Sequence, residues 1–284
     1  MYSSKEYFNL KNKIAVVTGG AGILGKSICE ALAKTGLKIA ILDIDGKMAE
    51  QTAMTISDKT GTKVIGINAN VLEKDSLIEA KKIINNILGP VDILINGAGG
   101  NAKKATTKAE SITEENLNKL DETFLGLDID AFKSTFDLNF IGTLLPSMIF
   151  STDMIIKKEG VILNISSMSA FHPLTKVPAY SAAKSSVNNF TEWLAVHLAK
   201  VGIRVNAIAP GFFLTSQNRF LLTDEKTDKL TPRGEKIIKN TPMERFGNPE
   251  DLHGTVIYLI SEMAEFVTGV VIPIDGGFNA FSGV

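Results

Sequence analysis

Short runs of β-branched and other apolar residues alternate with helix-length amphipathic stretches along almost the whole chain. The apolar runs occupy residues 14–17, 38–42, 64–67, 91–95, 161–165, 204–208 and 270–273, and long amphipathic stretches occupy 47–60, 74–88, 131–157, 180–200 and 250–261. Strands that are almost continuously apolar are typical of a parallel sheet whose two faces are both covered by helices. The pattern therefore predicts an α/β fold, a doubly wound parallel sheet with helices on both faces.

Neither an internal repeat nor a Pro-, Gly- or Ser-rich linker divides the 284 residues, so we expect residues 1–284 to form a single domain. Two segments interrupt the alternation. Residues 101–131 are polar and longer than an ordinary connection, and residues 212–241 after Pro210 and Gly211 form a segment of similar length. Because insertions of this length in a compact domain are commonly functional, we predict an inserted loop at 101–131 and a substrate lid at 212–241.

Composition and charge exclude several classes of partner. Hydrophobic residues make 44% of the chain and the formal net charge is −1, which fits a globular protein without a basic field for nucleic acid or anionic lipid. Cys29 is the only cysteine, so no disulfide can form within the chain. We find neither a signal peptide pattern at 1–10 nor a run approaching the ~18 apolar residues of a membrane span. We therefore expect a cytoplasmic protein without a nucleic-acid or membrane partner.

A glycine-rich turn follows the first apolar run and precedes the first helical stretch. It contains Gly19, Gly22, Ile23, Leu24 and Gly25. Glycines let the backbone approach a pyrophosphate, and the helix N-terminus offers free N–H groups to it. In this strand–turn–helix context the turn predicts a Rossmann-type dinucleotide site. The alternative is a glycine-rich turn without a ligand.

An acidic residue stands at the position that such a site requires. Asp43 follows the second apolar run, about 20 residues after the glycines, where a carboxylate binds the hydroxyls of the adenosine ribose. A carboxylate there would repel a 2′-phosphate, and the flanking residues are not cationic. The sequence therefore favours NAD over NADP, unless Asp43 or Asp45 is only a turn residue.

Tyr180 and Lys184 are four residues apart, a spacing that places both side chains on one face of a helix. A phenol titrates near ~10, so acid–base work at neutral pH needs a nearby cation, which Lys184 can supply. Ser167 lies two residues after the apolar run at 161–165, at the carboxyl edge of the predicted sheet where ligands of such sheets bind. These three residues form the predicted chemical centre.

The sequence resembles the short-chain dehydrogenase/reductase family from about residue 10 to its end. The matching motifs are Thr18-Gly19 with Gly25, Asp43, Asn96-Gly97-Ala98-Gly99, Asn139, Ser167, Tyr180-x-x-x-Lys184, Pro210-Gly211 and Ile274-Asp275-Gly276-Gly277. The resemblance implies that Tyr180 is the general acid/base, that Lys184 lowers its pKa and holds the nicotinamide ribose, and that Ser167 orients the substrate. It also implies an NAD-dependent enzyme that interconverts an alcohol and a ketone.

The resemblance assigns further residues to the cofactor and to proton transfer. Asn139 would hold a proton-relay water. Asn96, Ala98 and Gly99 would shape the adenosine and ribose side of the site, whereas Pro210, Gly211, Phe213 and Thr215 would meet the nicotinamide carboxamide. The sequence differs from the family pattern at two positions of the cofactor site. Ile23 stands where a glycine is usual, and Asn70, just before Val71, stands where the family commonly has an aspartate that contacts adenine. An amide can still donate and accept there.

Polar and cationic residues lie in the segments nearest the expected pocket. Candidate substrate contacts, besides Ser167, are Asn101, His172, Asn218, Arg219 and Arg233. This set suits a small polyhydroxylated acid, because arginine can grip a carboxylate with two hydrogen bonds and amides can read hydroxyls. Asn101 and His172 could equally support loops, and the arginines could be solvated or lie between subunits. His172, His197 and His253 lack the spacing of metal ligands, so we expect no metal.

Within the family, several stretches resemble one branch, the D-mannonate oxidoreductases (fructuronate reductases) of hexuronate catabolism. They include residues 95–101, 136–146, 164–184 and 271–284. The resemblance implies a sugar-acid substrate, D-mannonate or D-fructuronate, and a homotetramer. Three alternatives stay open: another polyol or gluconate-type dehydrogenase, a 3-oxoacyl reductase, and a non-catalytic NAD-binding protein.

Overall fold

In the computed structural model, which describes residues 8–214, 219–224 and 229–283, seven strands form one parallel sheet. The strand order is β3-β2-β1-β4-β5-β6-β7, so the chain reverses direction along the sheet between β1 and β4. The strands are β1 (Ile14–Thr18), β2 (Lys38–Asp43), β3 (Val64–Asn68), β4 (Ile93–Asn96), β5 (Gly160–Ile165), β6 (Ile203–Pro210) and β7 (Val271–Ile274). The predicted doubly wound Rossmann-type fold is confirmed.

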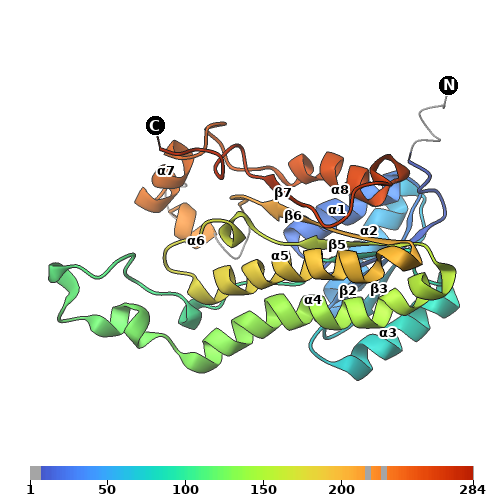
Figure 1. Ribbon diagram of the computed structural model, residues 1–284, viewed down its shortest axis with the longest axis horizontal. Coiled ribbons are helices and arrows are strands. Elements are labelled where there is room, and N and C mark those ends of the chain that lie inside the picture. Colours follow the sequence, from blue (N-terminus) through green and yellow to red (C-terminus); the bar gives the residue numbers. More distant parts are fainter. Residues whose placement is uncertain (1–7, 215–218, 225–228, 284) are drawn as a thin grey trace.

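Helices cover both faces of the sheet (Figure 1). They are α1 (Ile23–Lys34), α2 (Gly46–Thr60), α3 (Lys74–Ile87), α4 (Ile129–Lys157), α5 (Pro178–Leu198), α6 (Arg219–Leu222), α7 (Pro232–Lys239) and α8 (His253–Ile260). The bounds of α2, α3, α4, α5 and α8 agree with the predicted amphipathic stretches to within a few residues. Helices α6 and α7 lie in the predicted lid at 212–241, where no helix was predicted from the sequence.

Alternate residues of β1 point into two separate cores. Ala15 and Val17 pack with residues of α1, α2 and α8, whereas Ile14 and Val16 pack with residues of α3, α4 and α5. Phe150 of α4 is fully buried in the second core, and truncating a buried phenylalanine to alanine costs about 3–5 kcal/mol. Because helices cover both faces, a ligand can reach the sheet only at the carboxyl ends of its strands, which we call the carboxyl edge.

The connection from β4 to α4 is the longest excursion of the chain. Residues 101–128 pass through four short 3₁₀ turns, η1 (Lys103–Ala105), η2 (Glu114–Asn116), η3 (Leu120–Glu122) and η4 (Phe124–Gly126). Figure 1 shows this segment extending past the first turns of α4 and α5, on the side where the strands end. It borders the same edge of the sheet as α6 and α7.

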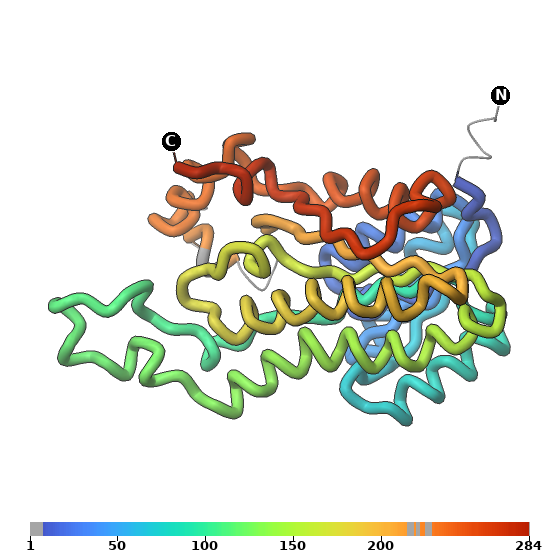
Figure 2. Tube along the Cα trace, in the orientation of Figure 1, coloured from blue at the N-terminus to red at the C-terminus, as the bar shows by residue number. Residues whose placement is uncertain are grey.

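The C-terminal segment returns to that edge (Figure 2). The Met243 N–H donates to the Gly276 carbonyl, and the ring of Phe278 packs edge-on against Phe212 with centroids 5.2 Å apart. The end of the chain therefore packs on the turn that follows β6.

Helix α4 is long and apolar enough to cross a membrane by length and composition alone, with a mean hydropathy of 1.3 in its most apolar window. Half of that window is buried inside the fold, and buried polar residues such as Asn139 and Asp153 lie on the helix. These are properties of a helix that packs against a sheet.

Candidate active site

The turn between β1 and α1 depends on glycine at two positions. Gly19 has a φ of +63°, and a Cβ added there would lie 2.8 Å from the Ala98 Cα. A Cβ at Gly25 would lie 2.3 Å from the Gly19 carbonyl oxygen. The Gly22 N-cap supplies no side-chain hydrogen bond to the first turn of α1. The turn is therefore compact, and the first amides of α1, which lack partners within the helix, are available to bind an anion.

Ile23, where the family pattern has glycine, begins α1 with a side chain that is 43% exposed. The isoleucine therefore extends from the turn without displacing its backbone.

Asp43 is oriented toward this turn. Its Oδ2 accepts a hydrogen bond from the Ala21 N–H at 3.2 Å, and its Oδ1 accepts one from the Asp45 N–H at 3.2 Å. Asp45 has a different task, because its carboxylate accepts from the Met48 N–H and caps α2. The carboxylate of Asp43 is thus fixed beside the glycine turn, where the ribose of a dinucleotide would lie.

Asn70 is used within its own loop. Its Nδ2 donates to Glu73 Oε1 at 2.8 Å, and its Oδ1 accepts from the Leu72 N–H at 3.0 Å. Val71 is buried, and its Cγ2 would lie 3.0 Å from a Cβ added at Gly142. The predicted adenine contact of the Asn70 side chain would therefore compete with the hydrogen bonds that shape residues 70–73.

Hydrogen bonds from β1 and from a buried polar network fix the loop that follows β4. Thr18 Oγ1 accepts from the Gly97 and Ala98 N–H groups at 3.1 and 3.2 Å. The side chain of Asn96 is buried, and its Nδ2 donates to Ser147 Oγ and to Asn164 Oδ1. The Asn96 amide lies in a polar network under the sheet edge, so the predicted role of Asn96 at the adenosine side would be carried by the backbone of the loop that it supports. The backbone of residues 97–100 is the part that reaches the edge.

Asn139 joins α4 to this loop. Its Oδ1 accepts from the Gly100 N–H, and its Nδ2 donates to the Gly100 and Thr135 carbonyls at 2.7 and 2.8 Å. A Cβ added at Gly99 would lie 2.6 Å from Asn139 Oδ1 and 3.4 Å from Lys184 Nζ. Gly99, Asn139 and Lys184 therefore meet at one point behind the loop.

Ser167, Tyr180 and Lys184 come together at the carboxyl edge of the sheet. Ser167 follows β5, and its hydroxyl is hydrogen-bonded to the Tyr180 side chain. Lys184 Nζ lies 5.6 Å from the centre of the Tyr180 ring and donates to the Ile165 carbonyl at 2.7 Å. Helix α5 places both residues because Pro178 starts it two residues before Tyr180. The arrangement brings a hydroxyl, a phenol and an amine together at the carboxyl edge of the sheet.

Burial controls the titration of this pair. It raises the pKa of Tyr180, and the hydrogen bond from Ser167 opposes that rise. It lowers the pKa of Lys184 to about 8, because a low-dielectric site disfavours the charged amine. This differs from the expectation that Lys184 lowers the pKa of Tyr180. Desolvation acts on both groups, and Lys184 Nζ bonds to a backbone carbonyl rather than to the phenol oxygen.

The turn after β6 reaches the same edge. The Gly211 N–H donates to the Ile274 carbonyl at 2.9 Å, and a Cβ at Gly211 would lie 2.6 Å from the Asp275 Cβ. Phe213 is 3% exposed and belongs to the core, so its backbone is what remains for the predicted carboxamide contact. Thr215 lies outside the described residues.

The predicted substrate residues have different surroundings. Asn101 Nδ2 donates to Thr106 Oγ1 at 2.7 Å, which supports its own loop. His172 is exposed after η5 (Met168–Ala170), and Arg219 is exposed at the start of α6. Arg233 donates to Glu110 and to Thr175. Asn218 lies outside the described residues.

Two hydroxyl groups at the carboxyl edge have structural roles that were not predicted from the sequence. The Thr18 hydroxyl fixes the β4 loop, and Ser166 Oγ donates to Asn188 Oδ1 on α5, one turn beyond Lys184. A hydroxyl at the end of a strand was the available sign for both. Within the described ranges, no three His, Cys, Asp or Glu side chains gather in a way that could hold a metal ion.

Comparisons with known proteins agree with this geometry. The short chain dehydrogenase family matches residues 13–226. An uncharacterized oxidoreductase of Haemophilus influenzae is 48% identical over 277 residues, covering 97% of this chain and 96% of the relative. A 2-dehydro-3-deoxy-D-gluconate 5-dehydrogenase of Formosa agariphila is 32% identical over 280 residues, covering 99% of this chain and 97% of the relative.

A solved structure from Haemophilus influenzae superposes with a TM-score of 0.93 at 47% identity, covering 99% of this chain and all of the other. That protein is provisionally assigned as a D-mannonate oxidoreductase and was solved with bound NAD. The family match covers most of the chain, and the two relatives align over almost their full length. The protein therefore belongs to the short-chain dehydrogenase family, whose members are oxidoreductases that act on CH–OH groups.

Proposed function

We propose that this enzyme interconverts D-mannonate and D-fructuronate with NAD as its cofactor. The observation that carries the proposal is the full-length likeness, at 47% identity and a TM-score of 0.93, to a provisionally assigned D-mannonate oxidoreductase with bound NAD. The likeness spans the excursion at 101–128 as well as the cofactor half.

The choice of NAD rests on Asp43. Its carboxylate faces the glycine turn and is held there by two backbone N–H groups. A fixed negative charge beside the adenosine ribose accepts hydrogen bonds from the ribose hydroxyls and repels a 2′-phosphate. NADP is therefore the poorer ligand.

When bound, the nicotinamide supplies or accepts the hydride. In reduction, the Tyr180 hydroxyl donates its proton to the carbonyl oxygen of the substrate, and in oxidation the ionised phenol takes the proton from the alcohol. The Ser167 hydroxyl donates a hydrogen bond to the same oxygen. Lys184, when protonated, stabilises the phenolate beside it, and Asn139 holds the loop at 97–100 against α4 and supports a proton-relay water.

The protein works as one dinucleotide-binding catalytic domain in this proposal, with the cofactor between the glycine turn and the turn after β6. Helices α6 and α7, within the predicted lid at 212–241, cover the substrate side. The excursion at 101–128 forms the opposite wall.

The first experiment measures NADH-dependent reduction of D-fructuronate by the purified protein. NADPH, D-fructose, 5-ketogluconate and an acetoacetyl thioester serve as comparisons, and Tyr180→Phe serves as the control variant. Rapid NADH oxidation with fructuronate alone, lost in the variant, supports the reaction, the cofactor and the acid–base role together. Binding of NADH without turnover of any of these compounds contradicts the substrate assignment and indicates a non-catalytic NAD-binding protein.

A gluconate-type dehydrogenase is the second candidate, and the 32% identity to a 2-dehydro-3-deoxy-D-gluconate 5-dehydrogenase favours it. It would keep Ser167, Tyr180 and Lys184 and differ in the residues around the substrate. Turnover of 5-ketogluconate faster than fructuronate identifies this case. Turnover of the thioester with NADPH would instead identify a 3-oxoacyl reductase, which the charge of Asp43 disfavours.

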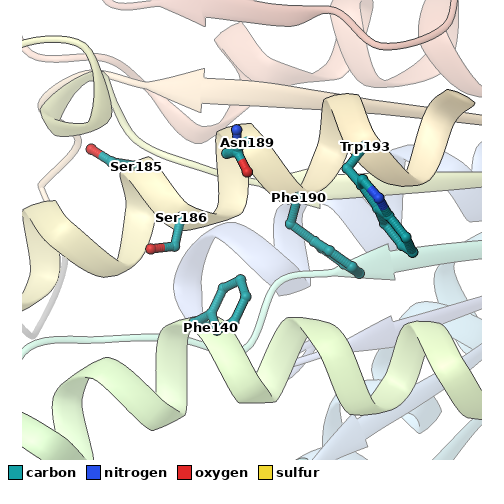
Figure 3. Close-up of a pocket in the computed structure, with 6 residues that line it drawn as sticks. All are labelled: Phe140, Ser185, Ser186, Asn189, Phe190 and Trp193. Atoms are coloured by element: carbon teal, nitrogen blue, oxygen red, sulfur yellow. The ribbon is translucent and has the colours of Figure 1, made fainter.

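The proposal includes a cytoplasmic homotetramer formed partly through α4 and α5. An aromatic stripe lies along these helices, and Figure 3 shows Phe140, Phe190 and Trp193 beside a pocket between them. Trp193 stacks on His197 with centroids 4.8 Å apart and is 57% exposed. Light scattering of the purified protein measures the stoichiometry, and Trp193→Glu is expected to dissociate the assembly.

A further inference from the structure

Arg233, on α7, contacts two segments that are distant in the sequence. Its Nη1 lies 3.0 Å from Glu110 Oε1 and 3.3 Å from Thr175 Oγ1, and its Nη2 lies 3.3 Å from the Thr175 carbonyl oxygen. The Arg233 side chain is only 18% exposed, whereas the Glu110 side chain is 34% exposed. A mostly covered guanidinium with three contacts to protein has few donors left for a ligand.

Glu110 receives a second cation from the same helix. Lys236 Nζ lies 3.0 Å from Glu110 Oε2, so the two oxygens of one carboxylate bind two cations that lie about one helical turn apart on α7. The two cations and the nearby Lys176 keep the pKa of Glu110 below its usual range. The carboxylate is therefore charged at neutral pH and links the excursion at 101–128 to α7.

A backbone contact ties the same excursion to the loop before α5. The Thr107 N–H donates to the Lys176 carbonyl at 2.9 Å, and Lys176 has a φ of +76°, a left-handed conformation that is uncommon for lysine. Two residues later Pro178 begins α5, which carries Tyr180 and Lys184. Residues 171–177 are thus held between the excursion at 101–128 and the start of α5.

Helix α7 is itself fixed at both its start and its buried face. The Thr231 hydroxyl accepts from the Gly234 N–H at 3.1 Å, a Cβ at Gly234 would lie 2.3 Å from the Leu222 carbonyl oxygen, and Ile237 is buried. The helix is therefore a firm support to which the excursion can attach.

We infer that Glu110 and Arg233 are positioning residues, a pair that holds the excursion at 101–128, the loop at 171–177 and α7 together around the substrate. Arg233 therefore does not bind the substrate carboxylate, contrary to the expectation from the sequence. This inference rests on the proposed function only in taking these three segments as the walls of the substrate site.

The two roles predict different kinetics. If the pair positions the walls, Glu110→Gln and Arg233→Gln should each raise KM about fivefold to tenfold while kcat stays within about twofold, since remote contacts contribute uniform binding. The double variant should be no worse than either single variant. The preference for D-fructuronate over neutral D-fructose in kcat/KM should persist in all three.

If Arg233 binds the carboxylate, the pattern changes. Arg233→Gln alone would then remove the preference for the acid by about 10²-fold or more, as expected for a lost charge-assisted bidentate contact. Glu110→Gln, by leaving the arginine free, would keep that preference or strengthen it. This result would overturn the inference.

Hydrogen exchange provides a readout that needs no substrate. The amides of residues 104–124 should exchange several-fold faster in Glu110→Gln and in Arg233→Gln than in the parent enzyme, and equally fast in the double variant. Glu79→Gln is the matched control, because it breaks an exposed pair with Lys82 on α3. Unchanged exchange at 104–124 would overturn the inference. Failure of the parent enzyme to reduce fructuronate would instead overturn the proposed substrate and leave the exchange test valid.

Discussion

The cofactor side and the substrate side of the candidate active site are held together by different kinds of contact. On the cofactor side, Gly19, Gly25 and the loop at 97–100 approach one another through backbone atoms with no room for a Cβ. On the substrate side, the excursion at 101–128 attaches to α7 through the charged side chains of Glu110, Arg233 and Lys236. Close backbone packing tolerates almost no substitution, whereas side-chain pairs between loops can be exchanged without moving the glycine turn. Substrate preference can therefore change without disturbing the cofactor site.

The strongest loss of activity is expected where the two sides meet. Tyr180→Phe removes the proton donor but leaves the ring in place, so kcat should fall about 10³-fold in both directions. The dissociation constant of NADH should stay within about twofold, which fluorescence titration can measure. Retention of more than a tenth of the parent activity would show that another group transfers the proton.

Gly25→Ala tests the rigidity of the cofactor side. The added methyl group would lie 2.3 Å from the Gly19 carbonyl oxygen, so the turn must open, and NADH affinity should fall about 100-fold together with the Tm. Gly254→Ala is the control, because a Cβ there meets nothing within 4 Å on α8. In that position alanine should leave NADH affinity unchanged and raise stability slightly. Equal behaviour of the two variants would contradict the close packing of the turn.

Asp43→Asn removes a negative charge from the cofactor side and keeps the size of the side chain. Loss of a charged acceptor for the ribose hydroxyls should weaken NADH binding about 30-fold. NADPH binding should change much less, since repulsion of its phosphate is removed at the same time. Calorimetric titration with both cofactors gives the ratio, and an unchanged ratio would assign Asp43 to the turn alone.

The pH dependence of kcat/KM tests the roles of Tyr180 and Lys184, which lie between the two sides. Burial lowers the pKa of Lys184 to about 8 and raises the pKa of Tyr180, so Lys184 loses its proton first. Oxidation needs the ionised phenol, which the charge on Lys184 stabilises, so kcat/KM for D-mannonate should rise about tenfold from pH 7 to 8 and level off above pH 8, where that charge is lost. Reduction of D-fructuronate needs the protonated phenol, which the raised pKa of Tyr180 preserves, so its kcat/KM should change by no more than about twofold over the same interval. Parallel profiles in the two directions would contradict this assignment.

Much of the fold and of the catalytic centre was predictable because the relevant patterns are local. The apolar runs indicated the strands, and the four-residue spacing of Tyr180 and Lys184 indicated their common helix face. Asp43 was predictable for the same reason, since it ends a strand at a fixed distance from the glycine turn. Such features depend on backbone geometry within a few residues.

The partners of other predicted site residues could not be read from the sequence, because each side chain takes its partner from a distant part of the chain. The amide of Asn96 turns inward to Ser147 and Asn164, Phe213 packs into the core, and Arg233 pairs with Glu110. A motif fixes where the Cα of such a residue lies, but several groups compete for the end of its side chain.

Periodicity and residue type act over short distances, and they were sufficient to specify the parallel sheet, the glycine turn, Asp43 and the order Ser167, Tyr180, Lys184. Three further properties required the folded structure: Asn139 closes on the loop at 97–100, burial sets the proton affinity of Tyr180 and Lys184, and Glu110 holds Arg233. These outcomes depend on desolvation and on contacts between residues far apart in the sequence, and both exist only once the polypeptide has folded.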